Sequence, residues 1–274
     1  MMKVEKLKEN NKSYSVTFVD VDLNKQEYVV SEDLVVNHRL IKGKVLDETA
    51  FRLFKADLQI DASLQKAKKL LSRYPKTIEE TKTYLHDKTA TTDDIDRIIK
   101  SLIALHYLDD FRFVKQYFER YFHADAIGPL KIAFDLKNRG VAEHIITGFI
   151  NRITEKDIEL NIEKLFYKKI AAFRQKPKTK AMLSMKQYLY QKGYSLDIAE
   201  TYVMKHAHEF ANIEQENQLL EKDFDKVSHR YEKINMTDYE RKNKIIQSLM
   251  NKGYRYEAIK QCWEGRSNHD GQNN

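Results

Sequence analysis

The sequence predicts a predominantly α-helical protein built from tandem three-helix repeats, with a small β-structured segment at its N-terminus. Three observations support this fold class. Only 8 Gly and 3 Pro occur among 274 residues, while 32% of the residues are charged, so the chain lacks the turn chemistry of a β-sandwich or barrel. From about residue 60, apolar residues recur at three- and four-residue steps, which is the helical period. A short motif containing Leu and Gly also recurs along the chain.

This motif reads "LKNRGV" (136–141), "LYQKGY" (189–194) and "LMNKGY" (249–254). The copies are about 50 to 60 residues apart, near the spacing expected for helical repeats. If each Gly follows a helix, the Leu four places earlier and the apolar residue after the Gly make the hydrophobic contact of a Schellman cap. The basic residue before each Gly then meets the negative end of the helix dipole. We therefore interpret the motif as a helix stop without a more specific function.

Composition excludes several classes of protein. The net charge of +7 and the pI near 9.1 are compatible with an anionic partner. A single cysteine, Cys262, excludes an internal disulfide and suits a reducing compartment. The opening "MMKVEKLKENNK" has no apolar core of a signal peptide, and no apolar run approaches transmembrane length. We expect a soluble cytoplasmic protein.

Residues 1–60 are predicted to form a separate N-terminal region. The segment 3–20 alternates weakly around Asn10 and Asn11, which is typical of a short hairpin or small sheet. Ser31, followed by two acidic residues, is a good N-cap, and the helix after it is expected to end near Gly43.

The first repeat is assigned to residues 61–108. Its first helix contains "SLQKAKKLLSRY" (63–74), with an apolar stripe from Leu64 to Tyr74. Thr77 and Glu80 have the spacing of a capping box for the second helix. The third helix presents one apolar face, formed by Ile95, Ile98, Ile99, Leu102 and Ile103. Thr89 stands where the other repeats have Gly, so a looser turn is expected there.

Three further repeats follow, at residues 109–153, 154–210 and 211–266, and a disordered tail is predicted for 267–274. Pro129 after Gly128 fits the first position of a helix. The middle helices are expected to end at Gly140, Gly193 and Gly253.

Three stretches carry a family resemblance. "RYPKTIEE" (73–80), "LHYLDDFRFVKQYF" (105–118) and "GPLKIAFDLKNRGV" (128–141) resemble the RecX family of bacterial RecA regulators. The resemblance is closest over residues 60–150, and the later repeats resemble those of the longer, four-repeat members. The chain departs from the family pattern at His106, where Gly is usual, and at Phe111, where an acid is common.

The resemblance implies an elongated, curved body of helical repeats without enzymatic activity. It also implies binding to RecA, usually as the filament on DNA, and restraint of its strand exchange, ATP hydrolysis and coprotease function in the SOS response. The family suggests lodging in the filament groove or stopping filament growth. DNA recombination and repair would be the processes affected. A set of repeats with its own core need not self-associate, so we expect a monomer.

The residues themselves do not indicate catalysis. Asp109 and Asp110 could form a metal or acid–base pair, but acids directly before a helix more often cap it. His206 and His208 are two residues apart on an expected helix and so point to different faces. Cys262 has no evident His partner. No phosphate-binding loop or dinucleotide motif is present. We expect no catalytic residue, cofactor or metal.

The most suggestive basic segment is "FYKKIAAFRQKPKTKAM" (166–182), where cations alternate with aromatic rings. Such a pattern can neutralise phosphates and stack on bases. The rings also fall at helical spacing, so core packing and a solvated loop explain the pattern at least as well. The candidate contacts to RecA or DNA are Lys131, Lys137, Arg139, Lys168, Lys169, Arg174, Lys176, Lys178 and Lys180. Direct binding to single-stranded DNA, or a generic helical scaffold, are the alternatives.

Overall fold

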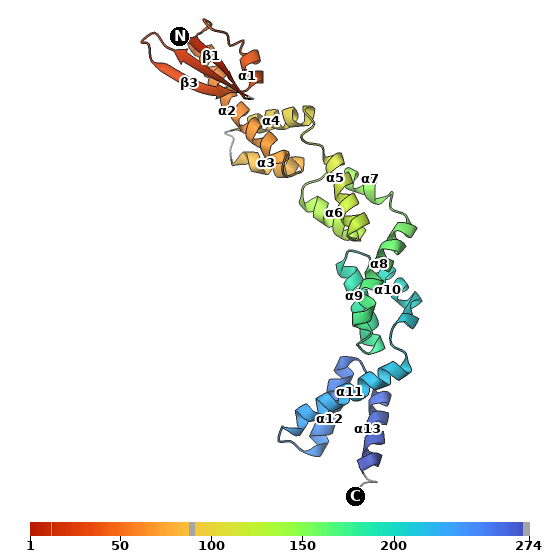
Figure 1. Ribbon diagram of the computed structural model, residues 1–274. Coiled ribbons are helices and arrows are strands. Elements are labelled where there is room, and N and C mark those ends of the chain that lie inside the picture. Colours follow the sequence, from red (N-terminus) through yellow and green to blue (C-terminus); the bar gives the residue numbers. More distant parts are fainter. Residues whose placement is uncertain (12, 88–90, 271–274) are drawn as a thin grey trace. The chain divides into compact units, whose positions relative to one another are not determined.

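The computed structural model describes residues 1–11, 13–87 and 91–270. A small antiparallel sheet is followed by helices to the end of the described chain, which confirms the predicted class (Figure 1). The chain forms two compact units. The first contains Met1–Gln116 and Leu136–Ile146, and the second contains Tyr117–Asp135 and Thr147–Asn274.

The N-terminal sheet has four strands rather than a single hairpin. Strands β1 (Met2–Asn10), β2 (Ser13–Val19), β3 (Lys25–Val30) and β4 (Val45–Leu46) pair antiparallel in the order β3-β2-β1-β4. Val4 pairs with Phe18 in the register of β1 and β2, and both side chains are fully buried. The alternating pattern of the sequence thus supplies one apolar face, which helices α1 (Glu32–Asn37) and α2 (Glu48–Leu71) cover.

Helix α1 (Glu32–Asn37) is shorter than predicted. Ser31 caps its start, but it ends before Arg39, not near Gly43. Arg39 adopts a left-handed φ of 47°, and the Leu40 N–H donates to the Val35 carbonyl in a Schellman closure. This closure places Leu40 in the sheet core, where it is 1% exposed. The free energy gained by burying Leu40 therefore exceeds the cost of a left-handed φ at Arg39.

Helix α2 (Glu48–Leu71) begins well before residue 61, capped by Asp47. Phe54 in its first half packs in the sheet core. Ala67 and Leu71 in its second half pack in the core of the first repeat. The predicted stripe was wrong at Tyr74, which lies after the helix and is exposed. The predicted boundary at residue 60 falls inside this helix.

We call the helix groups α2–α4, α5–α7, α8–α10 and α11–α13 repeats 1 to 4. Repeat 1 continues with α3 (Ile78–His86) and α4 (Thr92–Ala104). The buried face of α4 contains Ile95, Ile98, Ile99 and Leu102, whereas Ile103 is exposed, contrary to prediction. The turn at Thr89 lies outside the described residues.

Repeat 2 contains α5 (Asp110–Phe118), a π-helical turn (Glu119–Ala124), α6 (Pro129–Asn138) and α7 (Glu143–Ile150). The sequence pattern did not predict the π-helical turn. It is followed by Ala126, whose φ of 54° is left-handed. The chain then turns into α6 with Pro129 at its first position.

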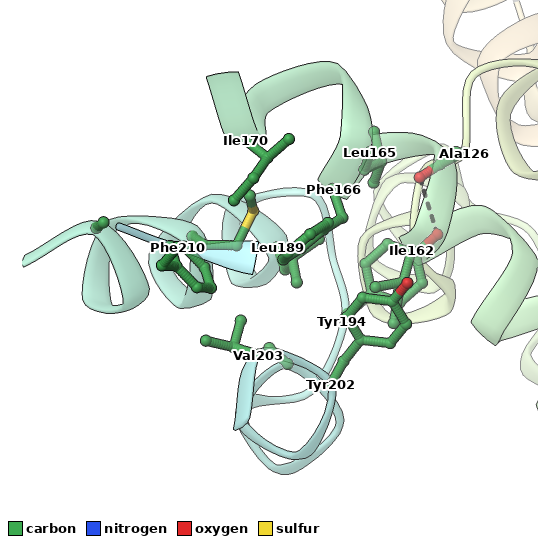
Figure 2. Packing of buried hydrophobic residues seen from close by; sticks show 13 residues of the cluster. Ala126, Ile162, Leu165, Phe166, Ile170, Leu189, Tyr194, Tyr202, Val203 and Phe210 are labelled. Atoms are coloured by element: carbon green, nitrogen blue, oxygen red, sulfur yellow. Dashed lines mark hydrogen bonds between the residues drawn. The ribbon is translucent and has the colours of Figure 1, made fainter. Parts of the chain in front are cut away.

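Repeat 3 contains α8 (Glu155–Phe173), α9 (Lys178–Gln191) and α10 (Leu196–Lys205), followed by a 3₁₀ turn (Ala207–Glu209). Its core surrounds Phe166, which is fully buried, and includes Leu189 and Tyr194 (Figure 2). Figure 2 also shows the hydrogen bond from the Tyr194 hydroxyl to the Ala126 carbonyl, at 2.9 Å.

Repeat 4 contains α11 (Ile213–Glu232), α12 (Asp238–Lys252) and α13 (Tyr256–Asp270). Its core centres on Phe224, Leu249 and Ile259. Helix α13 continues beyond residue 266, where the sequence pattern places the start of the tail. Residues 271–274 lie outside the described residues.

All three motif glycines have the Schellman geometry. Gly140, Gly193 and Gly253 have φ values of 75°, 97° and 104°. In each case the next residue donates its N–H to the Leu carbonyl five places earlier, as Tyr194 does to Leu189.

The same glycines have a second role that the sequence did not indicate. A Cβ atom built on Gly140 would lie 2.4 Å from the Cβ of Glu79, and one on Gly193 would lie 2.4 Å from the Cβ of Lys131. A Cβ on Gly253 would lie 2.9 Å from the Cβ of Lys180. Each contacted residue is in the first turn of the middle helix of the preceding repeat. The motif therefore joins consecutive repeats as well as ending helices.

Candidate interaction surfaces

The nine candidate cations divide between the two units. Lys137 and Arg139, at the end of α6, belong to the first unit, and the other seven belong to the second. Their surroundings separate cations that stabilise the fold from cations that are free to bind a partner.

Arg139 is used by the fold. Its guanidinium lies 3.2 Å from the Glu80 carboxylate and stacks over the Phe113 ring at 5.5 Å. Its carbonyl accepts a hydrogen bond from the hydroxyl of the buried Thr77, at 2.6 Å. The neighbouring Lys137 is exposed and has no ion pair with a described residue.

The basic segment of repeat 3 begins on α8. Phe166 is in the core, whereas Tyr167 and Lys168 are exposed, so the aromatic rings of this segment do not share one surface. Lys169 lies over the Tyr188 ring at 5.7 Å. Lys168 forms no ion pair within the described chain, which leaves it available to a partner.

The loop after α8 is held by its own contacts. The Arg174 guanidinium pairs with the Glu209 carboxylate at 2.5 Å and also donates to the Glu209 carbonyl. The Lys176 ammonium donates to the Ser184 hydroxyl at 3.2 Å and lies over the Phe173 ring at 4.9 Å. These two cations therefore fix the loop, and it is not a freely solvated linker.

Three candidate lysines stand in the first turns of middle helices. Lys131 and Lys180 contact the motif glycines through their Cβ atoms, so their stems belong to the contacts between repeats. The backbone N–H of Lys178 donates to the Glu216 carboxylate at 3.3 Å. None of their three ammonium groups has an ion pair among the described residues. Their charges can therefore still meet an anionic partner.

The acidic pair at the start of α5 is occupied by backbone groups. Asp109 accepts the N–H of Arg112 and so caps its own helix. Asp110 accepts the N–H of Ile78 at 2.9 Å and so serves the start of α3. Burial, and then the nearby carboxylates, raise the pKa of Asp110. Thr77 and Glu80 form the capping box of α3.

The surroundings of His206, His208 and Cys262 do not indicate a catalytic or metal-binding role. The His206 ring stacks on Tyr202, with centroids 4.1 Å apart, whereas His208 is exposed. Burial raises the pKa of the Cys262 thiol, which disfavours the reactive thiolate. Among the described residues, no group of three or more His, Cys, Asp or Glu side chains could hold a metal ion.

Sequence reasoning missed an apolar groove of about 350 Å³ between α8 and α10. Ile158, Ile162, Ile198 and Tyr202 line it, with Glu155, Glu159 and Asp197 among its rim residues. The apolar pairs are spaced four residues apart on each helix, which was a visible signal. Their juxtaposition depends on how the two helices pack, which the spacing does not state. Such a groove suits an apolar side chain rather than an anion.

No helix in the described part of the chain is long and apolar enough to cross a membrane.

Comparisons with known proteins agree with this architecture. Residues 214–263 match the family described as "RecX, third three-helix domain", and these residues form repeat 4 here. A crystal structure of RecX from Lactobacillus salivarius has a TM-score of 0.50 and 23% identity, and the match covers 55% of this chain and 97% of that one. It supports the fold.

Two relatives match most of the chain. Regulatory protein RecX of Listeria monocytogenes is 28% identical over 91% of this chain and 90% of its own length. Regulatory protein RecX of Enterococcus faecalis is 31% identical over 85% of this chain and 86% of its own length. With 31% identity to that relative over 85% of its length, the chain belongs to the RecX family of regulatory proteins.

Proposed function

We propose that this regulator binds the RecA recombinase, as the filament on DNA, and inhibits its ATP hydrolysis, strand exchange and SOS coprotease activity. The 31% identity to a regulatory protein RecX over 85% of the chain carries this proposal. Recombination and DNA repair are the processes that it would modulate, acting in the cytoplasm as a monomer.

The regulator acts by docking and is not an enzyme. The acid pair that most resembles catalytic chemistry, Asp109 and Asp110, is engaged with backbone N–H groups. The one cysteine has a raised pKa. Stacked helices present extended surfaces that suit a large partner.

The unpaired cations favour a partner that contains DNA. Lys137 in the first unit and Lys168 in the second are exposed and have no ion pair within the described chain. Attraction between such groups and a filament that contains DNA weakens with salt, because ions screen exposed charges.

The test is ATP hydrolysis by RecA on single-stranded DNA, titrated with this protein. We expect hydrolysis to fall at well below one protein per RecA. The charge-reversed variant Lys137→Glu/Lys168→Glu is expected to need more protein for the same inhibition. Lys222→Glu/Lys226→Glu, at two exposed positions of α11 without an ion pair among the described residues, is the matched control. Unchanged hydrolysis at every concentration of the wild-type protein would refute the proposed function.

Direct binding of single-stranded DNA is the second candidate function. A cationic pocket in the first unit, lined by residues near the end of α2 and the start of α5, favours it. Anisotropy of the same DNA without RecA separates the two candidates. Tight binding to bare DNA with no effect on RecA would make the second candidate the correct one.

A further inference from the structure

A pocket of about 440 Å³ lies in the first unit where the end of α2, the loop before α3 and the start of α5 meet. Its volume is within the range of sites for small organic groups. Three basic side chains line it, those of Lys76, His106 and Arg112, together with the aromatic rings of Tyr107 and Phe113. None of these residues belongs to the basic segment singled out in the sequence.

The charged groups of this pocket are available to a ligand. The side chains of Lys76 and Arg112 have no ion pair or hydrogen bond among the described residues. The one carboxylate in the lining, Asp109, already accepts the backbone N–H of Arg112. The pocket therefore has an excess of positive charge, and arginine and lysine are the side chains that most often bind phosphate oxygens.

His106 adds an independent observation. It has a left-handed φ of 58°, and it ends α4 in a Schellman closure where Gly would be unstrained. The Tyr107 N–H donates to the Leu102 carbonyl at 2.9 Å, which completes this closure. A side chain in a strained conformation beside two free cations points to a role for its imidazole.

The aromatic ring of Tyr107 suits a nucleobase. Tyr107 is 39% exposed, so its ring is accessible while the chain around it is fixed by the closure of α4. Bases of a single strand stack on such rings, whereas the bases of a duplex are already stacked on each other.

We propose that this pocket binds one nucleotide of single-stranded DNA, with a backbone phosphate between Lys76, Arg112 and His106 and its base against Tyr107. The site would let the regulator touch the DNA strand that a RecA filament carries. The assignment rests on the pocket and does not require the RecA interaction.

The first measurement is anisotropy of a fluorescein-labelled oligothymidylate at several salt concentrations, without RecA. Lys76→Ala/Arg112→Ala is expected to lower the affinity about tenfold at low salt. The slope of log affinity against log salt concentration should become less steep by about one to two, because two cations no longer contact phosphates. Lys66→Ala/Lys100→Ala removes two exposed lysines from α2 and α4 that do not line the pocket, and should change the affinity much less. Equal losses in the two double variants would overturn the proposal.

His106→Gly separates binding from folding. Gly relieves the left-handed strain, so the unfolding temperature should stay the same or rise, while the affinity for the oligothymidylate falls. Unchanged affinity in this variant would contradict the role of His106. Tyr107→Ala should weaken binding to the single strand, and equal affinity of the wild-type protein for a duplex of the same length would contradict stacking.

Retention of RecA on the immobilised protein, measured without DNA, keeps the two proposals apart. The pocket variants should retain RecA as the wild-type protein does. If the wild-type protein retains no RecA, the proposed regulation of RecA fails, and the DNA titrations still decide the pocket.

Discussion

Repeats 2 and 3 meet at Gly193, and repeats 3 and 4 meet at Gly253. These two glycines hold equivalent positions in the motif, but their contacts are made differently. At the first, Gly128 and Gly193 bring two backbones together. The Gly128 N–H donates to the Lys192 carbonyl at 2.7 Å, and the Leu130 N–H donates to the Gly193 carbonyl at 3.1 Å. A Cβ on Gly128 would lie 2.3 Å from the backbone of Gly193, so only glycine fits.

At the second contact, Pro177 replaces Gly128 before the middle helix. Proline has no N–H, so the corresponding backbone bond cannot form. The Lys178 N–H instead donates to the Glu216 carboxylate, at 3.3 Å. The difference teaches that one motif can join repeats through the backbone, which fixes their spacing, or through side chains, which can adjust.

The largest effect is expected for Gly193→Ala. A left-handed φ costs a residue with a side chain about 1 to 2 kcal/mol, and overpacking against Lys131 adds about 1 to 3 kcal/mol. Urea unfolding of the full chain should show a lower midpoint for the transition that contains repeats 2 and 3. A loss below about 1 kcal/mol would mean that this backbone contact is not tight.

Gly253→Ala should cost less. The strain of a left-handed φ is similar, but the new Cβ would meet a lysine Cβ at 2.9 Å and no backbone atom closer than 3.6 Å. We expect about 1 to 2 kcal/mol from the same urea measurement. A loss equal to or larger than that of Gly193→Ala would break the comparison.

Tyr194 and Tyr254 provide a second comparison of these two contacts. The Tyr194 hydroxyl, buried, donates to the Ala126 carbonyl, so Tyr194→Phe leaves that carbonyl unsatisfied at a cost of about 1 to 3 kcal/mol. The Tyr254 hydroxyl donates to Asp223, which also accepts from Lys252 at 2.7 Å. Tyr254→Phe should therefore cost only about 0.5 to 1.5 kcal/mol, measured by thermal unfolding. The reverse order would show that the fourth repeat is held more firmly than its contacts indicate.

The smallest effect concerns the contact between repeats 1 and 2, where Asp110 accepts the Ile78 N–H. Burial raises the pKa of Asp110, so the stability that it contributes is present at low pH and is lost as pH rises through that pKa. Asp110→Asn keeps an acceptor without the charge. In thermal unfolding, this variant should have a slightly higher midpoint than the wild-type protein at neutral pH. At acidic pH the two midpoints should be equal. Destabilisation at neutral pH would mean that the charge itself is needed.

Helix ends could be predicted from the sequence because their signals are local. The Leu and Gly of "LYQKGY" lie within one turn of each other, and so do Thr77 and Glu80. The partner of each Gly could not be predicted, because Lys131 and Gly193 are far apart in the sequence and their contact depends on how the repeats pack. The early end of α1 was missed because burial of Leu40 placed Arg39, and not a glycine, in a left-handed conformation.

The candidate contacts to a partner stay a prediction, but the structure shows which of these cations have partners within the fold. Basic residues near Pro177 were visible in the sequence, but Arg174 and Lys176 turned out to have fold partners. The pocket around Lys76 was missed because its two cations come from separate segments, and neither Lys76 nor Arg112 belongs to a basic run. Charge density along the chain thus does not show which cations the fold already uses.

Helix α2 acts mechanically as a single rod of about 36 Å, since each of its 24 residues adds about 1.5 Å. Its first half is embedded in the sheet core through Phe54, and its second half in repeat 1 through Ala67. A partner that binds the sheet and rotates it would therefore rotate repeat 1 as well, because the two cores share this helix. Cutting the chain at residue 60 would divide α2 and leave each core with only part of the helix. The N-terminal sheet is therefore not an independent module.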